Sequence, residues 1–152
     1  MTLPIPFFER VKSFNKMYGL PTPSIPTAGS PQELRSRLLR FKEILQDEVN
    51  EVDDIINAID SMGNPSQVMT MLADWLGDIS VYAASEAQRH GLPLEYVLSI
   101  IMDSNESKLG ADGKPIVENG KVIKGPNYWK PEPKIQMLLE SLVAISQKEF
   151  TV

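Results

Sequence analysis

The stretch that decides the fold is residues 34–59, LRSRLLRFKEILQDEVNEVDDIINAI. Its large side chains recur at alternating steps of four and three residues, which is the spacing of one face of an α-helix. The positions on this face are Leu34, Leu38, Phe41, Leu45, Glu48, Val52, Ile55 and Ile59. All of them are apolar except Glu48. A carboxylate on a buried face is costly unless another group compensates its charge, so the pattern predicts a partner for Glu48.

Three further acids fall where they can meet Glu48. Glu51 lies one turn further along the same helix. On the next predicted helix, Asp78 has Asp74, Trp75, Val81 and Tyr82 as neighbours at three- and four-residue spacing, so it is expected among large apolar side chains. Four acids facing one interior predict a bound divalent metal. Carboxylate oxygens without a nearby histidine favour Mg²⁺ or Mn²⁺ over zinc or copper, and Mg²⁺ usually keeps water and substrate phosphate in its shell.

Simpler interpretations exist for the same acids. A lone Glu-x-x-Glu pair is most often a solvated helix face, and Glu43, Asp53 and Asp54, which fall off the apolar line, are expected to be ordinary solvated charges. Asp74 and Asp78 would instead form a polar seam between helices if nearby side chains made hydrogen bonds to their carboxylates. The side chains available for that are Tyr82, Ser80 and Arg40.

The remaining sequence predicts an all-α bundle of about five helices with one small β-hairpin. Capping and periodicity place helices at 7–17, 30–59, 66–90, 93–105 and 133–148, with a proline-rich connector at 20–31. A two-residue Asn-Gly turn between alternating apolar residues predicts the hairpin near 115–124. Two long helices joined by a short turn at 61–65 must pack antiparallel. The 152 residues fit a single domain, 1–152.

The amino-acid composition argues against several classes of protein. There is no cysteine, which excludes a disulfide framework and a thiolate metal site and fits a reducing cytoplasm. The net charge of -5 argues against binding to nucleic acid or to an anionic membrane. The first residues lack a signal-peptide pattern, and no stretch approaches the length of a membrane span. We therefore expect a cytoplasmic protein without nucleic-acid or membrane partners.

Positive charge follows the fourth predicted helix. Lys108 ends the run Ser104-Asn105-Glu106-Ser107-Lys108, and Lys114, Lys121 and Lys124 lie on the hairpin. Such lysines are commonly solubility residues, yet a polyphosphate held by metal on one side needs cations on the other. The glycine-rich segment 110–130 could close as a lid. Tyr128 and Trp129 could stack on a base, although simple packing is the commoner role. His90, the only histidine, is interpreted as a helix cap.

These motifs together resemble the all-α nucleoside triphosphate pyrophosphatases. The residues that carry the resemblance are DEVNE at 47–51, LADWLGDISVY at 72–82, HGLP at 90–93 and SNESK at 104–108. The group includes MazG-type enzymes, dimeric dUTPases and phosphoribosyl-ATP pyrophosphohydrolase. The tail at 112–126 is similar to the MazG-like branch often labelled phosphoribosyl-ATP pyrophosphohydrolase-like.

The family pattern is Glu-Glu-x-x-Glu followed by Glu-x-x-Asp on two antiparallel helices, with the acids holding Mg²⁺. The resemblance implies that Glu48, Glu51 and Asp78 are metal ligands and that Asp47 stands for the first glutamate. The chain departs at the fourth acid, where it has Trp75. Asp74, four residues before Asp78, is the natural substitute. Asn105 and Lys108 match residues near the family's substrate, and Lys124 matches less securely.

The function implied is Mg²⁺-dependent hydrolysis of a nucleoside triphosphate to the monophosphate and pyrophosphate, in nucleotide-pool house-cleaning. Glu48 or Asp47 would orient or deprotonate water, and Asn105, Lys108, Lys124, Tyr128 and Trp129 would bind substrate. The resemblance also implies a homodimer or homotetramer. One alternative is phosphoribosyl-ATP as substrate. Another is a noncatalytic helical module in which Trp75 has disabled the site. A ferritin-like di-iron bundle is disfavoured, because the chain has no Glu-x-x-His pair.

Overall fold

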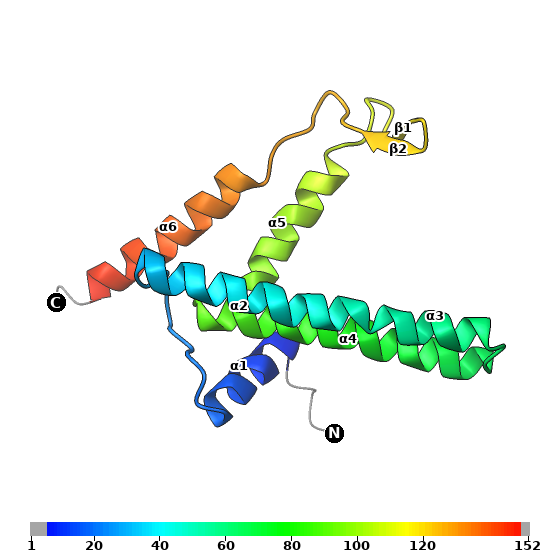
Figure 1. Ribbon diagram of the computed structural model, residues 1–152. Helices are drawn as coiled ribbons and strands as arrows, with labels where there is room; N and C mark the ends of the chain where they lie inside the picture. The colour runs from blue at the N-terminus through cyan, green and yellow to red at the C-terminus, as the bar shows by residue number, and fades with distance from the viewer. Residues whose placement is uncertain (1–5, 150–152) are drawn as a thin grey trace, which may run out of the picture. The chain divides into compact units, whose positions relative to one another are not determined.

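A computed structural model of the chain describes residues 6–149. It divides into two compact units, Met1–Gly91 and Leu92–Val152. The described elements are helices and one short two-stranded sheet (Figure 1), which confirms the predicted all-α class and the small hairpin. Within residues 6–149, none of the helices combines the length and apolar content that crossing a bilayer requires.

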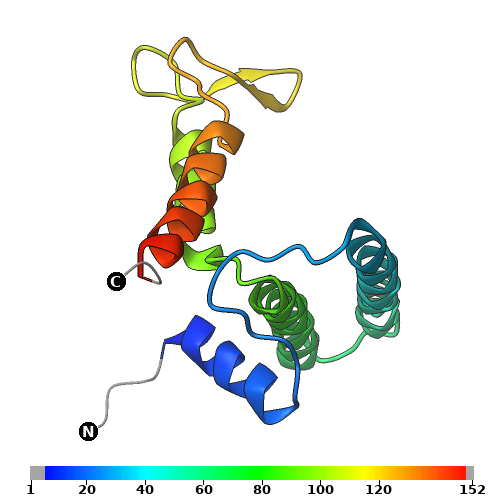
Figure 2. The same ribbon diagram turned by 90° about the vertical axis from the view of Figure 1, so that its left-hand side faces the viewer.

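The first unit is built around one long helix. This helix, α4, has α1 on one side and the α2–α3 pair on the other (Figure 2). The α2–α3 pair and α4 are joined by a short turn and lie side by side as an antiparallel hairpin (Figure 1), as predicted. The bounds are α1 Phe7–Met17, α2 Pro31–Asn50, α3 Val52–Asp60 and α4 Pro65–Arg89.

Local signals in the sequence set the start of both long helices. At α2, the Ser30 side chain accepts from the Glu33 backbone N–H and the Glu33 carboxylate accepts from the Ser30 backbone N–H, with Pro31 in the first turn. At α4, the Asn64 side chain accepts from the Ser66 N–H at 2.8 Å. These caps satisfy backbone donors that would otherwise have no partner.

The predicted continuous helix at 30–59 is divided at Glu51, which is a correction to its predicted extent. The Glu51 N–H bonds the carbonyl of Glu48, and the Asp54 N–H bonds the carbonyl of Glu51. This three-residue spacing belongs to a tighter turn than the α-helix. The Trp75 indole N–H also donates to the Glu48 carbonyl, at 2.8 Å. A side chain that competes for a carbonyl in this way is a known cause of helix interruption.

The second unit contains α5, the hairpin and α6. Helices α5 and α6 contact each other and run in opposite directions (Figures 1 and 2). The strands pair antiparallel with Val117 opposite Val122, on either side of an Asn119-Gly120 turn in which both residues have positive φ. The bounds are α5 Leu94–Glu106, β1 Ile116–Glu118, β2 Lys121–Ile123 and α6 Glu132–Glu149.

Few apolar side chains are fully buried in the described part of the chain. They are Val11, Ile55, Ala84 and Ala87, and they are matched by as many buried polar or charged residues: Asn15, Glu48, Glu86 and Ser104. Many large apolar side chains on the helices of the first unit remain exposed. The packing within one chain therefore leaves considerable apolar surface uncovered.

Candidate metal centre

Glu48 lies on the buried face of α2, as its place in the apolar pattern predicted. Only 6% of the residue is exposed. Its Oε1 atom is buried and has no hydrogen-bond partner within residues 6–149. A buried carboxylate oxygen without a partner is rare in folded proteins and calls for an explanation such as an absent ion.

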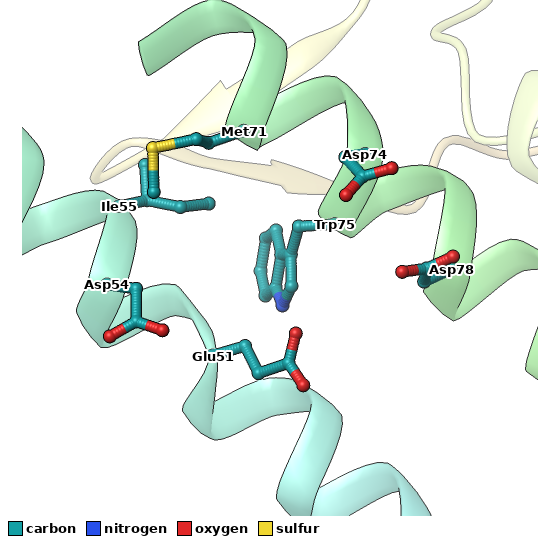
Figure 3. A pocket seen from close by; sticks show the side chains of 7 residues that line it. All are labelled: Glu51, Asp54, Ile55, Met71, Asp74, Trp75 and Asp78. Carbon is teal, nitrogen blue, oxygen red and sulfur yellow. The ribbon is translucent and has the colours of Figure 1, made fainter. Parts of the chain in front are cut away.

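Three of the predicted ligands line one small pocket beside Glu48. The pocket has a volume of about 120 Å³ and lies between the α2–α3 junction and the middle of α4. Glu51 approaches from the junction, while Asp74 and Asp78 lie one turn apart on α4 (Figure 3). Figure 3 shows the Glu51 carboxylate directed across the gap toward α4. The complete lining is Glu51, Asp54, Ile55, Met71, Asp74, Trp75 and Asp78.

The electrostatics of this region are unfavourable without a cation. Burial raises the pKa of the Glu48 carboxyl above its ordinary value, and the negative charges of Glu51, Asp78 and Asp74 raise it further. A divalent ion would neutralise this repulsion and give the free Glu48 oxygen a partner. The donor set, carboxylate oxygens alone, fits Mg²⁺ or Mn²⁺.

The four acids lie in one region, but their carboxylates do not converge on a single point. Among the described side chains, no three acids or histidines converge closely enough to hold an ion as they are placed. Glu51, Asp74 and Asp78 are exposed, so the expectation that all four acids face the interior, with Asp78 among large apolar side chains, is wrong for these three. Their side chains have room to rotate. The donors are thus present on both helices, and side-chain rotation would be needed to bring them onto one ion.

Two of the three alternative partners considered for Asp74 and Asp78 are engaged elsewhere. The Ser80 hydroxyl donates to the carbonyl of Leu76 at 2.7 Å, and Arg40 pairs with Glu43 at 3.0 Å. These two interactions weaken the interpretation that Asp74 and Asp78 form a polar seam whose hydrogen-bond partners are neighbouring side chains.

Trp75 occupies the position at which the resemblance led us to expect an acid. Its indole lines the pocket with Met71 and Ile55 (Figure 3), and its N–H bonds the Glu48 carbonyl on the facing helix. The hydrogen bond joins α4 to the end of α2, where Glu48 and Glu51 are placed. Sequence reasoning identified the missing acid but not this bond.

Two other acids lie differently from the expected arrangement. Asp47, predicted as a catalytic partner of Glu48, is exposed and lines a separate hollow with Leu39, Lys42, Glu43 and Gln46. Asp54, expected to be an ordinary solvated charge, is exposed but contributes to the lining of the acidic pocket. Its carboxylate is directed away from Asp74 and Asp78 (Figure 3).

The predicted substrate-binding residues all lie in the second unit. Lys108 donates to the Asn105 side chain at 2.7 Å, and the Lys124 ammonium lies 4.5 Å from the centre of the Tyr128 ring. The Trp129 ring is 3.6 Å below the Lys134 ammonium. The Trp129 backbone is fixed by hydrogen bonds to the hydroxyls of Ser104 and Ser107. The structure therefore brings these residues into cation–aromatic and amide pairs that order the segment between α5 and α6.

An ionic cluster around the buried Glu86, which sequence reasoning missed, lies at the end of α4. Glu86 accepts from Arg37 Nε at 3.0 Å and Nη2 at 2.5 Å, and from His90 Nε2 at 3.0 Å. Hydrogen bonds and charges from Arg37 and His90 lower the pKa of Glu86 against the opposing effect of burial. His90 is the C-cap of α4, as predicted, but the contact between its ring and Glu86 was not predicted.

Comparisons with known proteins add a structural likeness. No family model and no curated protein matches the chain. Among solved structures, the chain is similar to a "putative NTP pyrophosphohydrolase" from Exiguobacterium sp. 255-15. The sequences are 20% identical, the match covers 97% of this chain and 100% of that one, and the TM-score is 0.46. Likeness at this level does not establish a family, so the functional argument rests on the residues of the site.

Proposed function

We propose that the chain is a Mg²⁺-dependent pyrophosphohydrolase that converts a nucleoside triphosphate to the monophosphate and pyrophosphate, in nucleotide-pool house-cleaning. The observation that carries the proposal is the buried Glu48 carboxylate, whose Oε1 has no hydrogen-bond partner within the described residues. Three more acids, from the two antiparallel arms of the hairpin, lie near enough for their charges to raise its pKa. A site that gathers this much negative charge and leaves a buried oxygen unpaired is suited to a divalent cation.

The residues that would hold the ion are Glu48, Glu51, Asp74 and Asp78. When bound, Mg²⁺ neutralises charge that develops on the phosphate oxygens during hydrolysis. Mn²⁺, which prefers the same oxygen ligands, would serve as a substitute.

The acids on α2 are proposed to position the attacking water. Glu48 is held on α2 by its buried place in the helix hairpin and by the Trp75 hydrogen bond to its carbonyl. From there its carboxylate would orient or deprotonate the attacking water. Asp47 is a second candidate base, although it faces a different hollow.

Substrate contacts are proposed for the second unit. Asn105, Lys108 and Lys124 present amide and ammonium groups suited to phosphate, and Tyr128 and Trp129 present rings suited to a base. The chemistry of these groups leaves both ordinary nucleoside triphosphates and phosphoribosyl-ATP as candidate substrates.

The experiment is to measure pyrophosphate release with Mg²⁺ from canonical, deoxy and modified triphosphates and from phosphoribosyl-ATP. Asp78→Asn should lower the rate by about 100-fold or more, because it removes a proposed ligand. Asp53→Asn, an exposed acid outside the pocket lining, is the matched control and should retain activity. Equal rates for the two variants, or no release from any substrate, would reject the proposal.

A noncatalytic helical module is the second candidate. It is favoured by the lack, among the described side chains, of a ready-made group of metal ligands and by Trp75 at the expected acidic position. This candidate predicts neither pyrophosphate release nor stabilisation by Mg²⁺.

We also propose that the chain assembles as a homodimer or homotetramer. The support is the large apolar surface left exposed on the first unit, including Leu39 (48%), Ile56 (47%) and Leu76 (51%). Light scattering after size exclusion should give twice or four times the chain mass of 17.0 kDa. Ile56→Glu should shift the assembly toward monomer, and a wild-type protein that is monomeric at all concentrations would contradict this assignment.

A further inference from the structure

A second and larger cavity lies at the open end of the helix hairpin, away from the acids in its middle. Its volume is about 720 Å³, and its walls are the connector, the start of α2 and the end of α4. Arg89, on this wall, is eleven residues beyond Asp78 on the same helix, or about 16 Å along the axis. The cavity is therefore separate from the acidic pocket. Its size falls in the range of pockets that hold small-molecule ligands.

Basic side chains outnumber acids around this cavity. Arg37, Arg89 and His90 all line it, and all three are directed toward the single carboxylate of Glu86. Glu86 forms hydrogen bonds with Arg37 and His90, but Arg89 Nε is 3.9 Å from it, which is too long for a hydrogen bond. One carboxylate is thus shared by two guanidinium groups and an imidazole. Arg89 is the most weakly engaged of the three, because its guanidinium makes no hydrogen bond to Glu86.

The other acid on the wall is held at the start of α2. Glu33 lines the cavity, and its carboxylate accepts from both the backbone N–H and the hydroxyl of Ser30. Those bonds lower the pKa of Glu33, so the carboxylate stays ionised while it caps the helix.

The connector that closes the cavity is fixed to α4. The Thr27 N–H donates to the carbonyl of His90 at 2.9 Å. Gly91 has a φ of +64°, and a Cβ at that position would lie 2.2 Å from the carbonyl oxygen of Ile25. Only glycine permits both this conformation and this close approach. The cavity wall is therefore a specific packed arrangement of the chain.

We propose that this cavity binds a phosphate-bearing small molecule of about nucleotide size through the guanidinium groups of Arg89 and Arg37. The planar fork of arginine matches the oxygen geometry of phosphate and forms strong, charge-assisted hydrogen bonds with it. His90 and Thr27 line the same wall, with His90 Nε2 bonded to Glu86 and the Thr27 hydroxyl donating to the Ile25 carbonyl. This proposal does not depend on the pyrophosphohydrolase assignment. The competing explanation is an ion cluster that serves only to join α2 to α4.

The test uses the full chain in EDTA, so that no divalent ion can recruit phosphate to the acidic pocket. Inorganic phosphate, pyrophosphate and adenosine monophosphate are titrated by calorimetry at constant ionic strength, with chloride as the reference. The wild type should bind at least one of these probes. Arg89→Gln should weaken that binding by about tenfold or more, because it removes a charge-assisted contact.

Three variants separate the possible sites. Asp78→Asn, in the acidic pocket, and Arg35→Gln, an exposed arginine on the same helix as Arg37, should bind as the wild type does. Ala28→Trp, on the exposed connector, should block the cavity without touching the ion cluster. The proposal is overturned if no probe binds to the wild type. It is equally overturned if binding survives both Arg89→Gln and Ala28→Trp, or if Asp78→Asn abolishes it.

Discussion

Replacement of Glu48 by glutamine should stabilise the protein when no metal is present. The change keeps the shape of the side chain but removes a charge that is 6% exposed, lacks a partner for Oε1 and is repelled by three other acids. A buried polar group without a partner costs about 1–3 kcal/mol and a charged one costs more, so replacing this charge by a neutral amide is worth about 1–3 kcal/mol although the amide is itself polar. Unfolding of a chain of this size shifts by about 2–4 °C per kcal/mol, so the melting temperature should rise by roughly 2–12 °C in EDTA.

The pH dependence of this gain has a definite sign. Because the pKa of Glu48 is raised in the folded protein, its ionisation opposes folding at pH values above its ordinary 4.5. The advantage of Glu48→Gln over the wild type should thus be greatest at neutral pH. It should shrink as the pH falls through the raised pKa of the folded state and vanish below 4.5, where the carboxyl is protonated in both states.

Metal should reverse the order of stability. Mg²⁺ should raise the melting temperature of the wild type and leave Glu48→Gln much less affected, because the variant has lost a proposed ligand. Trp75 fluorescence, in a Trp129→Phe background, follows unfolding of the first unit beside the site. Asp53→Asn is the control for loss of an acid. If metal-free Glu48→Gln melts at a lower temperature than the wild type, the charge of Glu48 is already compensated without a cation, and the proposed role as a metal ligand is refuted.

Three other substitutions test separate features of the first unit. Trp75→Phe removes the indole N–H that is bonded to the Glu48 carbonyl. It should lower the free energy of unfolding, measured by urea titration, by about 1 kcal/mol and weaken Mg²⁺ binding. If both quantities are unchanged, the hydrogen bond contributes neither to stability nor to the metal site. Glu86 has a lowered pKa in the folded state, so the stability that it confers should be present above 4.5 and be lost as the pH falls through the lower, folded-state value. Melting curves of Glu86→Gln should lack this acid-sensitive component. Gly91→Ala should cost more than about 1 kcal/mol, and more than Gly19→Ala, which shares the positive φ but has open space around its Cβ; equal melting temperatures for the two would refute the steric argument.

Local patterns predicted most of the helical framework. The Ser30 and Asn64 caps, the Asn119-Gly120 turn and the four-three spacing of the apolar face each act over a few residues, so they are visible in the sequence. The same spacing placed Glu48 on a buried face while Asp47 stayed exposed. The burial of Glu48 was therefore predictable from periodicity alone.

Features that depend on contacts between helices were not predictable. The interruption at Glu51 accompanies a hydrogen bond from Trp75, which is 27 residues away from Glu48. The ion cluster at Glu86 joins Arg37 to a position 49 residues later. No periodicity marks such pairs, because each partner alone looks like an ordinary charged or aromatic helix residue.

The most direct test of the central claim is a titration of the metal-free chain with Mn²⁺, followed by the loss of free-ion signal in electron paramagnetic resonance. The account predicts saturable binding by the wild type and by Asp53→Asn, competition by Mg²⁺, and binding that is about tenfold weaker or worse in Glu48→Gln and Asp78→Asn. Absence of binding to the wild type, or equal binding by all four proteins, would contradict the assignment of these acids as a metal centre.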